Sequence, residues 1–212
     1  MSIFCDGACS GNGRKGAVGG WGWAYWAGPV RGEPTAAAAD RLDVPPGLPA
    51  TNQRAELTAL LKVLRWLAAA TPPVTSIDIY TDSMYTINCT STWGPAWKKA
   101  GWKRKTGEPL LNLDLIVPLV ELWRPSWRLH HVRGHQTNSS PQAYGNNWVD
   151  QAAVAGAEGK VLSPSSFSSF IVPVTSPSPS TSVPATVVKA PTLPATLTLA
   201  QAKQTDLRMW FS

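Results

Sequence analysis

The chain has 212 residues, which is enough for one domain of ordinary size and an appendage. Its 11 Trp and its 43% apolar residues can build a core, and its net charge of +6 favours a polyanionic partner. No run approaches the roughly 18 apolar residues of a membrane span, and Asp6 comes too early for a signal peptide, so we expect neither a membrane protein nor a secreted one.

The first predicted element is a buried strand that ends at an acid. The apolar pair Ile3-Phe4 leads into Asp6, and a turn rich in Gly, Ser and Asn follows. A carboxylate held there needs a cation, a donor or a metal, although an Asp that closes a surface turn is the simpler explanation. Residues 19–26 alternate Trp with small residues and predict a second strand, paired with the first as a hairpin. Residues 28–50 hold a third strand and an irregular loop.

Residues 51–70 form the clearest predicted helix, with Thr51 as its N-cap. Its apolar side carries Leu57, Leu60, Val63, Leu64 and Leu67, and its other side carries Arg54, Lys62 and Arg65. Glu56 falls on the apolar side, one turn after Asn52. An acid there is costly unless it is compensated, so Glu56 is either a functional carboxylate or one that pairs with an Arg or reaches solvent at the rim.

A third acid closes the next predicted strand. Residues 76–82 alternate in polarity and end at Asp82. Sites form at the C-terminal ends of strands in an open α/β sheet, which favours a functional Asp82. The alternative is that Asp82 caps the short helix expected from Ser83 onward.

The stretch 93–105 is basic and rich in Trp. It carries five cations, three Trp and no acid. A charge run is usually a solvated helical face, but Trp beside cations is typical of a surface that stacks bases and contacts phosphates. The candidate contacts are Trp97, Lys98, Lys99, Trp102, Lys103, Arg104 and Lys105.

The next elements are a helix over residues 110–123, which Pro118 bends or delays, and a strand over residues 127–132. A polar loop follows. Residues 148–155 then predict a closing helix with Asp150 in its first turn.

Four acids therefore stand on strand ends and helices in a β-β-β-α-β-α-β-α order: Asp6, Glu56, Asp82 and Asp150. Four converging carboxylates repel one another and raise one another's pKa. Two divalent cations about 3.5–4 Å apart would resolve that conflict and activate water at a phosphodiester. Ligands that are all oxygen favour magnesium or manganese over zinc.

Five motifs, taken in order, resemble type 1 ribonuclease H, the ribonuclease HI family. They are Asp6-Gly7-Ala8-Cys9-Ser10-Gly11-Asn12, Thr51-Asn52-Gln53-Arg54-Ala55-Glu56-Leu57, Tyr80-Thr81-Asp82-Ser83, Val132-Arg133-Gly134-His135 and Asn146-Asn147-Trp148-Val149-Asp150. The resemblance covers roughly residues 1–156 and implies an α/β, ribonuclease H-like fold with a five-stranded mixed sheet flanked by helices. It also implies an endonuclease that cleaves the RNA strand of RNA–DNA hybrids, leaving 5′-phosphate and 3′-hydroxyl ends, in primer or R-loop removal.

By this resemblance the four acids are catalytic and hold two Mg²⁺ ions, with Mn²⁺ as the alternative. Cys9, Asn12, Asn52 and Gln53 match hybrid contacts, some of them to the 2′-hydroxyl that separates RNA from DNA. Thr51 matches a phosphate contact on the DNA strand, and the basic stretch is similar to the family's substrate-binding protrusion. His135 matches a loop His that assists proton transfer or product release, although a lone loop His favours a structural role.

We also expect a monomer in the cytoplasm, or wherever the genome is replicated. The odd number of Cys, without metal-ligand spacing, agrees with reduced thiols there. Three departures stand out: Met84 where many relatives carry Gln, a long loop between His135 and Asp150, and an expanded segment 28–50. Two alternatives stay open, namely another nuclease on this fold, such as a transposase, integrase or junction resolvase, and a non-catalytic hybrid-binding module.

The composition changes near residue 157. Residues 157–200 are rich in Ser, Thr and Pro and predict a disordered linker. Residues 201–212 are similar to a short sliding-clamp-binding motif, except that Trp stands where Phe or Tyr is usual. One helical turn would bring Leu207, Trp210 and Phe211 to one side, where they could insert into a groove of a replication clamp. We therefore predict such a clamp as a partner. The alternative is that the two aromatic residues fold back onto the domain. The motif residues are Gln204, Leu207, Trp210 and Phe211.

Overall fold

The computed structural model describes residues 1–70, 73–104 and 106–160. Five strands form one sheet in the order β3-β2-β1-β4-β5. The first two strands form the predicted hairpin, β3 pairs antiparallel with β2, and β1, β4 and β5 run parallel. The predicted mixed sheet is therefore confirmed. The strands are β1 (Ser2–Ser10), β2 (Val18–Trp26), β3 (Ala36–Arg41), β4 (Ile77–Thr81) and β5 (Trp127–His131).

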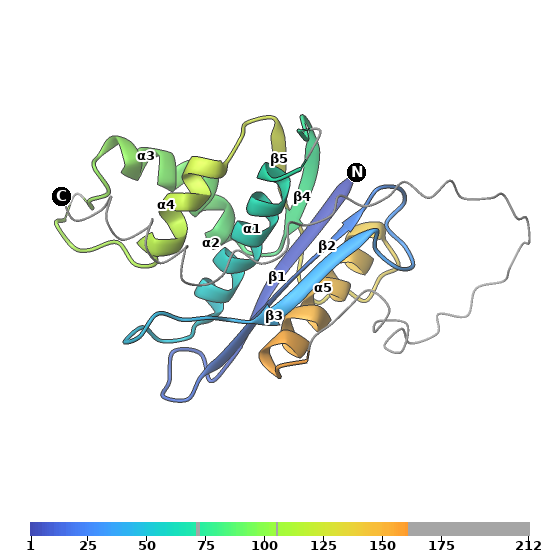
Figure 1. Cartoon of the computed structure of the whole chain (residues 1–212), viewed down its shortest axis with the longest axis horizontal. Coiled ribbons are helices and arrows are strands. Elements are labelled where there is room, and N and C mark those ends of the chain that lie inside the picture. The colour runs from blue at the N-terminus through green and yellow to red at the C-terminus, as the bar shows by residue number, and fades with distance from the viewer. Residues whose placement is uncertain (71–72, 105, 161–212) are drawn as a thin grey trace, which may run out of the picture. The chain divides into compact units, whose positions relative to one another are not determined.

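Helices cover both faces of the sheet (Figure 1). The helix α1 and the helices from α2 to α4 pack on one face, and α5 packs on the other. The helices are α1 (Asn52–Ala68), α2 (Met84–Ile87), the π-helix η1 (Asn88–Thr92), α3 (Trp93–Lys99), α4 (Leu113–Leu122) and α5 (Pro141–Ala157). As predicted, Thr51 is the N-cap of α1, since its side chain accepts a hydrogen bond from the backbone N–H of Arg54 at 3.2 Å.

The core is divided by the alternation of side chains along the strands. On β1, Ile3 and Cys5 face α1, whereas Phe4 faces α5 and packs with Trp26 and Trp148. Both clusters are rich in aliphatic and aromatic side chains, so the central strands are buried on both faces. Their ends carry the polar groups of the candidate site.

Three details differ from the sequence-based predictions. The first strand does not end at Asp6, because β1 continues to Ser10 against β2. The closing helix α5 begins at Pro141, capped by Ser140, so Asp150 lies in its middle and not in its first turn. Arg54 is buried, although the helical pattern placed it on the solvent side.

Other predictions lie at or beyond the limits of the described residues. The boundaries 1–156, 157–200 and 201–212 stay predictions, as do Gln204, Leu207, Trp210 and Phe211, because residues 161–212 are outside the described part. Lys105 is outside it as well. Within the described part, the helices are all too short or too polar to cross a membrane, and all three Cys are free.

Candidate active site

Two of the four predicted acids lie on neighbouring strands. Asp6 is in β1, just beyond Phe4, where the parallel pairing of β1 with β4 ends. Asp82 directly follows β4. Because β1 and β4 are adjacent and parallel, both carboxylates come to the same edge of the sheet. Sequence alone placed Asp82 at a strand end, and Asp6 reaches the same edge even though its own strand continues.

Glu56 and Asp150 come from the two helices on opposite faces of the sheet. Near Glu56, α1 approaches β1 so closely that a Cβ on Gly7 would lie 2.2 Å from the carbonyl carbon of Ala55. Only Gly therefore fits beside Asp6. Asp150 projects from the middle of α5, and both acids are close enough for their charges to raise the pKa of Asp6. The structure thus brings all four acids together.

Two polar side chains hold the acids in place. The hydroxyl of Ser83 donates a hydrogen bond to Glu56, and the amide of Asn146 donates to Asp82 Oδ2 at 3.3 Å. Asn146 is buried, and its Oδ1 has no hydrogen-bond partner within the described residues. Neither residue was singled out from the sequence. The available signals were a hydroxyl directly after Asp82 and an amide one helical turn before Asp150.

Burial and mutual repulsion raise the pKa of three of the carboxyls. For Asp6, burial first and the charge of Asp82 second raise the pKa to about 8, against the hydrogen bond from the Gly7 N–H. Burial raises the pKa of Glu56, opposed by Ser83, and it also raises the pKa of Asp150, opposed by His135. The folded chain therefore holds more negative charge here than it neutralises itself.

The cluster suits a hard divalent cation. Its donors are carboxylate oxygens, and among the described residues no Lys or Arg forms an ion pair with any of the four acids. Donors that are all oxygen fit Mg²⁺ or Mn²⁺ better than zinc, and the missing ion pairs leave the negative charge for a metal to neutralise. As the side chains stand in the described ranges, no three His, Cys, Asp or Glu residues form a group that could hold a metal ion. The acids are repelling neighbours, not a preformed cage.

His135 lies beside the cluster, on the loop between β5 and α5. Its Nδ1 is 4.0 Å from Asp150 Oδ2, its side chain is 85% exposed, and its backbone has a positive φ of 49°. The preceding Gly134 packs on Asp82, since a Cβ there would lie 2.6 Å from Asp82 Oδ2. The loop therefore delivers a titratable ring, open to solvent, to the edge of the acidic cluster.

The predicted hybrid contacts gather at the N-terminus of α1. Asn12 Oδ1 accepts a hydrogen bond from the backbone N–H of Asn52 at 3.0 Å, which ties the β1–β2 turn to the helix. Asn52 and Gln53 are exposed beside it, and Thr51 caps the helix. Cys9 precedes the same turn: its thiol donates to the Ser10 carbonyl, and the backbone N–H groups of Asn12 and Gly13 donate hydrogen bonds to its sulfur.

A hollow of about 350 Å³ adjoins this turn. The cations Arg14 and Lys15 line one side of it, and Leu48, Pro49 and Ala50 line the other. The backbone N–H of Gly13 donates to the Ala50 carbonyl at 2.7 Å, which joins the two sides. Two cations therefore lie close to Asn12 on this surface.

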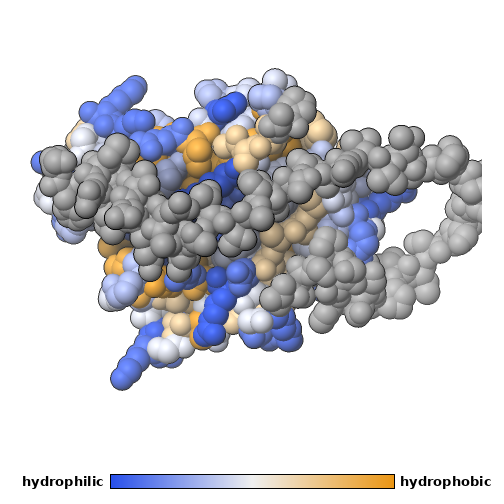
Figure 2. All heavy atoms as spheres, in the orientation of Figure 1, coloured by the Kyte–Doolittle hydropathy of each residue, from blue (hydrophilic) through white to orange (hydrophobic). Residues whose placement is uncertain are grey.

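The basic stretch forms a mixed surface that we call the basic–tryptophan surface. It comprises Trp93, Trp97, Lys98, Lys99, Trp102, Lys103 and Arg104. Its four cations are exposed, Trp93 is 41% exposed, and the other two Trp are half-buried against the core. The rings of Trp93 and Trp97 lie 5.9 Å apart. Figure 2 shows blue hydrophilic side chains beside orange hydrophobic ones on this face of the molecule. The Trp residues thus anchor the surface as well as line it.

A mixed five-stranded sheet with four acids gathered at one edge defines a protein of the ribonuclease H-like class. The family model described as RNase H matches residues 1–158. The chain therefore belongs to the RNase H family.

Curated relatives agree with this assignment. The chain is 38% identical over 160 residues to "Ribonuclease H" of Cyanothece sp., covering 74% of this chain and 89% of the relative. It is 37% identical over 161 residues to "Ribonuclease H1" of Mus musculus, again covering 74% of this chain but 50% of the relative. The chain thus spans about half the length of the mouse protein and most of the cyanobacterial one.

Solved structures show the same fold. The crystal structure of LC9-RNase H1, described as a type 1 RNase H with the type 2 active-site motif, matches with a TM-score of 0.58 at 26% identity, covering 81% of each chain. The solution structure of the PFV RNase H domain matches with a TM-score of 0.61 at 22% identity, covering 74% of this chain and 93% of that one. The second likeness concerns the fold alone.

Proposed function

We propose that this chain is an endoribonuclease that cleaves the RNA strand of RNA–DNA hybrids, leaving 5′-phosphate and 3′-hydroxyl ends, in primer or R-loop removal. The observation that carries the proposal is the convergence of Asp6, Glu56, Asp82 and Asp150 in a chain of the RNase H family. A family member that only bound hybrids would not need four mutually repelling acids.

The acids would hold two divalent ions, Mg²⁺ or Mn²⁺. When bound, these ions neutralise the cluster, activate water and stabilise the leaving oxygen. The protein orients the carboxylates itself: Ser83 fixes Glu56, and Asn146 fixes Asp82. His135, exposed and close to Asp150, is placed to move a proton between the site and solvent.

Substrate recognition is divided between two surfaces. At the start of α1, Asn12, Asn52 and Gln53 offer side-chain amides to 2′-hydroxyls, and the helix N-terminus at Thr51 suits a phosphate. The basic–tryptophan surface, together with Lys105, offers cations to the backbone phosphates of the hybrid. Cys9 completes the proposed contacts.

A substrate panel tests this function. We expect the protein with Mg²⁺ or Mn²⁺ to cut the labelled RNA strand of an RNA–DNA hybrid, and to leave duplex DNA and duplex RNA of the same sequence intact. The products should carry 5′-phosphates and 3′-hydroxyls. Cleavage of duplex DNA in preference to the hybrid would instead assign a resolvase-like or transposase-like activity, and binding without cleavage would assign a hybrid-binding module.

A replication sliding clamp is the proposed partner of residues 201–212, where Leu207, Trp210 and Phe211 can form a three-pronged plug beside Gln204. A peptide of these residues should bind the purified clamp, and a peptide with Trp210→Ala and Phe211→Ala should not. Equal binding of the two peptides, or no binding of either, would reject this partner.

A further inference from the structure

Arg54 is a buried cation in the first turn of α1. It is 3% exposed, although the helical pattern placed it on the solvent side. A buried guanidinium is costly unless it is paired and hydrogen-bonded. Here its Nη1 and Nη2 donate to the two carboxylate oxygens of Asp114, in the first turn of α4, at 3.0 and 2.5 Å. The pair of hydrogen bonds from the guanidinium thus joins the start of α1 to the start of α4.

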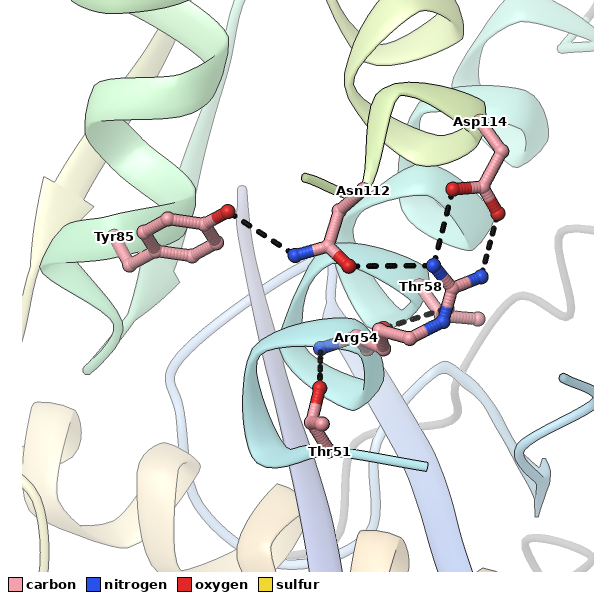
Figure 3. Close-up of polar contacts among 6 residues, drawn as sticks. All are labelled: Thr51, Arg54, Thr58, Tyr85, Asn112 and Asp114. Atoms are coloured by element: carbon pink, nitrogen blue, oxygen red, sulfur yellow. Dashed lines mark hydrogen bonds and ion pairs between the residues drawn. The ribbon is translucent and has the colours of Figure 1, made fainter. Parts of the chain in front are cut away.

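The contacts of Arg54 extend beyond this ion pair (Figure 3). Its Nη1 also donates to Asn112 Oδ1 at 3.2 Å, and the Asn112 amide donates to the hydroxyl of Tyr85 at 3.1 Å. Asn112 has a left-handed backbone with φ of 59° and precedes α4, whereas Tyr85 lies in α2. One side chain of α1 is therefore linked to both ends of the segment 86–111.

That segment carries the basic–tryptophan surface. The Tyr85 ring contacts Trp93 at 6.3 Å between centroids, and Trp93 in turn contacts Trp97. On the outer side of the same turn of α1 lie the exposed Asn52 and Gln53. A continuous row of contacts therefore joins the two surfaces that the proposed function assigns to the hybrid.

We propose that Arg54 is a positioning residue, which sets the basic–tryptophan surface relative to the first turn of α1 through Asn112, Asp114 and Tyr85, so that both surfaces engage one hybrid at once. The inference rests on the proposed function and deepens it. Binding by two surfaces is strong only when their spacing is fixed before the ligand arrives, since otherwise ordering them weakens the affinity.

The mildest probe is Tyr85→Phe, which removes the hydroxyl that Asn112 binds and keeps the ring against Trp93. We expect the KM for a hybrid to rise about 2- to 10-fold, which is the change in affinity that the loss of one hydrogen bond produces. The kcat should change little. The matched control is Tyr144→Phe, which removes a hydroxyl that donates to the Gly32 carbonyl at 3.2 Å on the α5 side of the sheet. It should leave KM unchanged. Arg54→Lys keeps the positive charge but loses the paired hydrogen bonds to Asp114. It should raise KM more than Tyr85→Phe.

A double-mutant cycle separates positioning from plain stability. In a background where Lys98, Lys99, Lys103, Arg104 and Lys105 are all Ala, there is no charged surface left to position. Tyr85→Phe should therefore change KM less than about 1.5-fold there, because the effects of coupled sites are not additive. An equal effect of Tyr85→Phe in both backgrounds, or none in the wild type, would overturn the proposal even if Arg54→Lys failed to fold. Loss of hybrid cleavage and binding by the wild-type protein itself would instead overturn the proposed function, and this inference with it.

Discussion

Replacing Asp82 with Asn should stabilise the metal-free protein while removing its activity. The charge of Asp82 contributes to raising the pKa of Asp6, Glu56 and Asp150. An Asn there would remove that repulsion and still offer an oxygen to the amide of Asn146. The carboxylate of Asp82 therefore lowers the stability of the fold, and its proposed role is in cleavage.

The size of this stabilisation can be derived from the pKa of Asp6, which is nearly fully buried. A rise of its pKa from 3.8 to about 8 corresponds to roughly 6 kcal/mol of unfavourable ionisation, at about 1.4 kcal/mol per pKa unit. Burial is the largest cause and Asp82 the second, so Asn at position 82 should return on the order of 1–2 kcal/mol. For a domain of this size the melting temperature would rise by about 2–8 °C.

The gain in stability from Asp82→Asn depends on pH. A carboxyl whose folded pKa is raised disfavours folding once it must ionise, so the stability of the wild-type protein should fall as pH rises from about 4 toward 8. The gain from Asp82→Asn should therefore be large at pH 8 and small at pH 5, where Asp6 keeps its proton in the folded state.

Thermal unfolding followed by circular dichroism in EDTA at both pH values measures this effect. Asp43→Asn, an exposed acid away from the cluster, serves as the control and should shift the melting temperature by little at either pH. A lower melting temperature for Asp82→Asn at pH 8, or the same gain at both pH values, would refute the electrostatic account of the cluster.

Three further outcomes are expected. Changing Lys105 and all the cations of the basic–tryptophan surface to Ala should raise KM and flatten its salt dependence. The log–log slope should fall by up to about 0.9 for each phosphate that is no longer neutralised, and an unchanged slope would mean that the surface is only a solvated helical face. His135→Ala should slow turnover by at most about 10²- to 10⁴-fold without abolishing it, and a loss as complete as that of Asp82→Asn would give His135 a larger role. The hydrogen bonds of Arg128 lower the pKa of Asp78 to about 2. Arg128→Ala should therefore lower the free energy of unfolding above pH 4 and change it little near pH 2. Acid unfolding of the wild-type and variant proteins measures this difference.

Much of the fold was predictable because the local signals were strong. The hairpin, the capped helix α1 and the strand before Asp82 each have a clear pattern, and the structure confirms all three. The helix over residues 110–123 was expected to be bent or to start late because of Pro118. It does start later than predicted, at Leu113, but Pro118 lies inside the helix and so does not set its start.

The failures have two physical causes. A helical pattern divides a helix into sides but does not reveal that a second helix covers the polar side, which is why the burial of Arg54 against α4 was missed. The first turns of α5 bury Ala143, Gly145 and Asn146, whose small or polar side chains give no apolar periodicity, so that part was predicted as a loop. The supporting contacts of Ser83 and Asn146 depend on tertiary structure, which brings them to acids that are distant in the sequence or on another element.

Cleavage of a labelled RNA–DNA hybrid by the wild-type protein and by Asp82→Asn, both shown to be folded by circular dichroism, tests the central claim most directly. We expect the wild-type protein to cut the RNA strand when Mg²⁺ or Mn²⁺ is present, and the variant to be equally folded but to retain almost no cleavage. A folded Asp82→Asn protein with near wild-type cleavage would contradict the assignment of catalysis to the four-acid cluster.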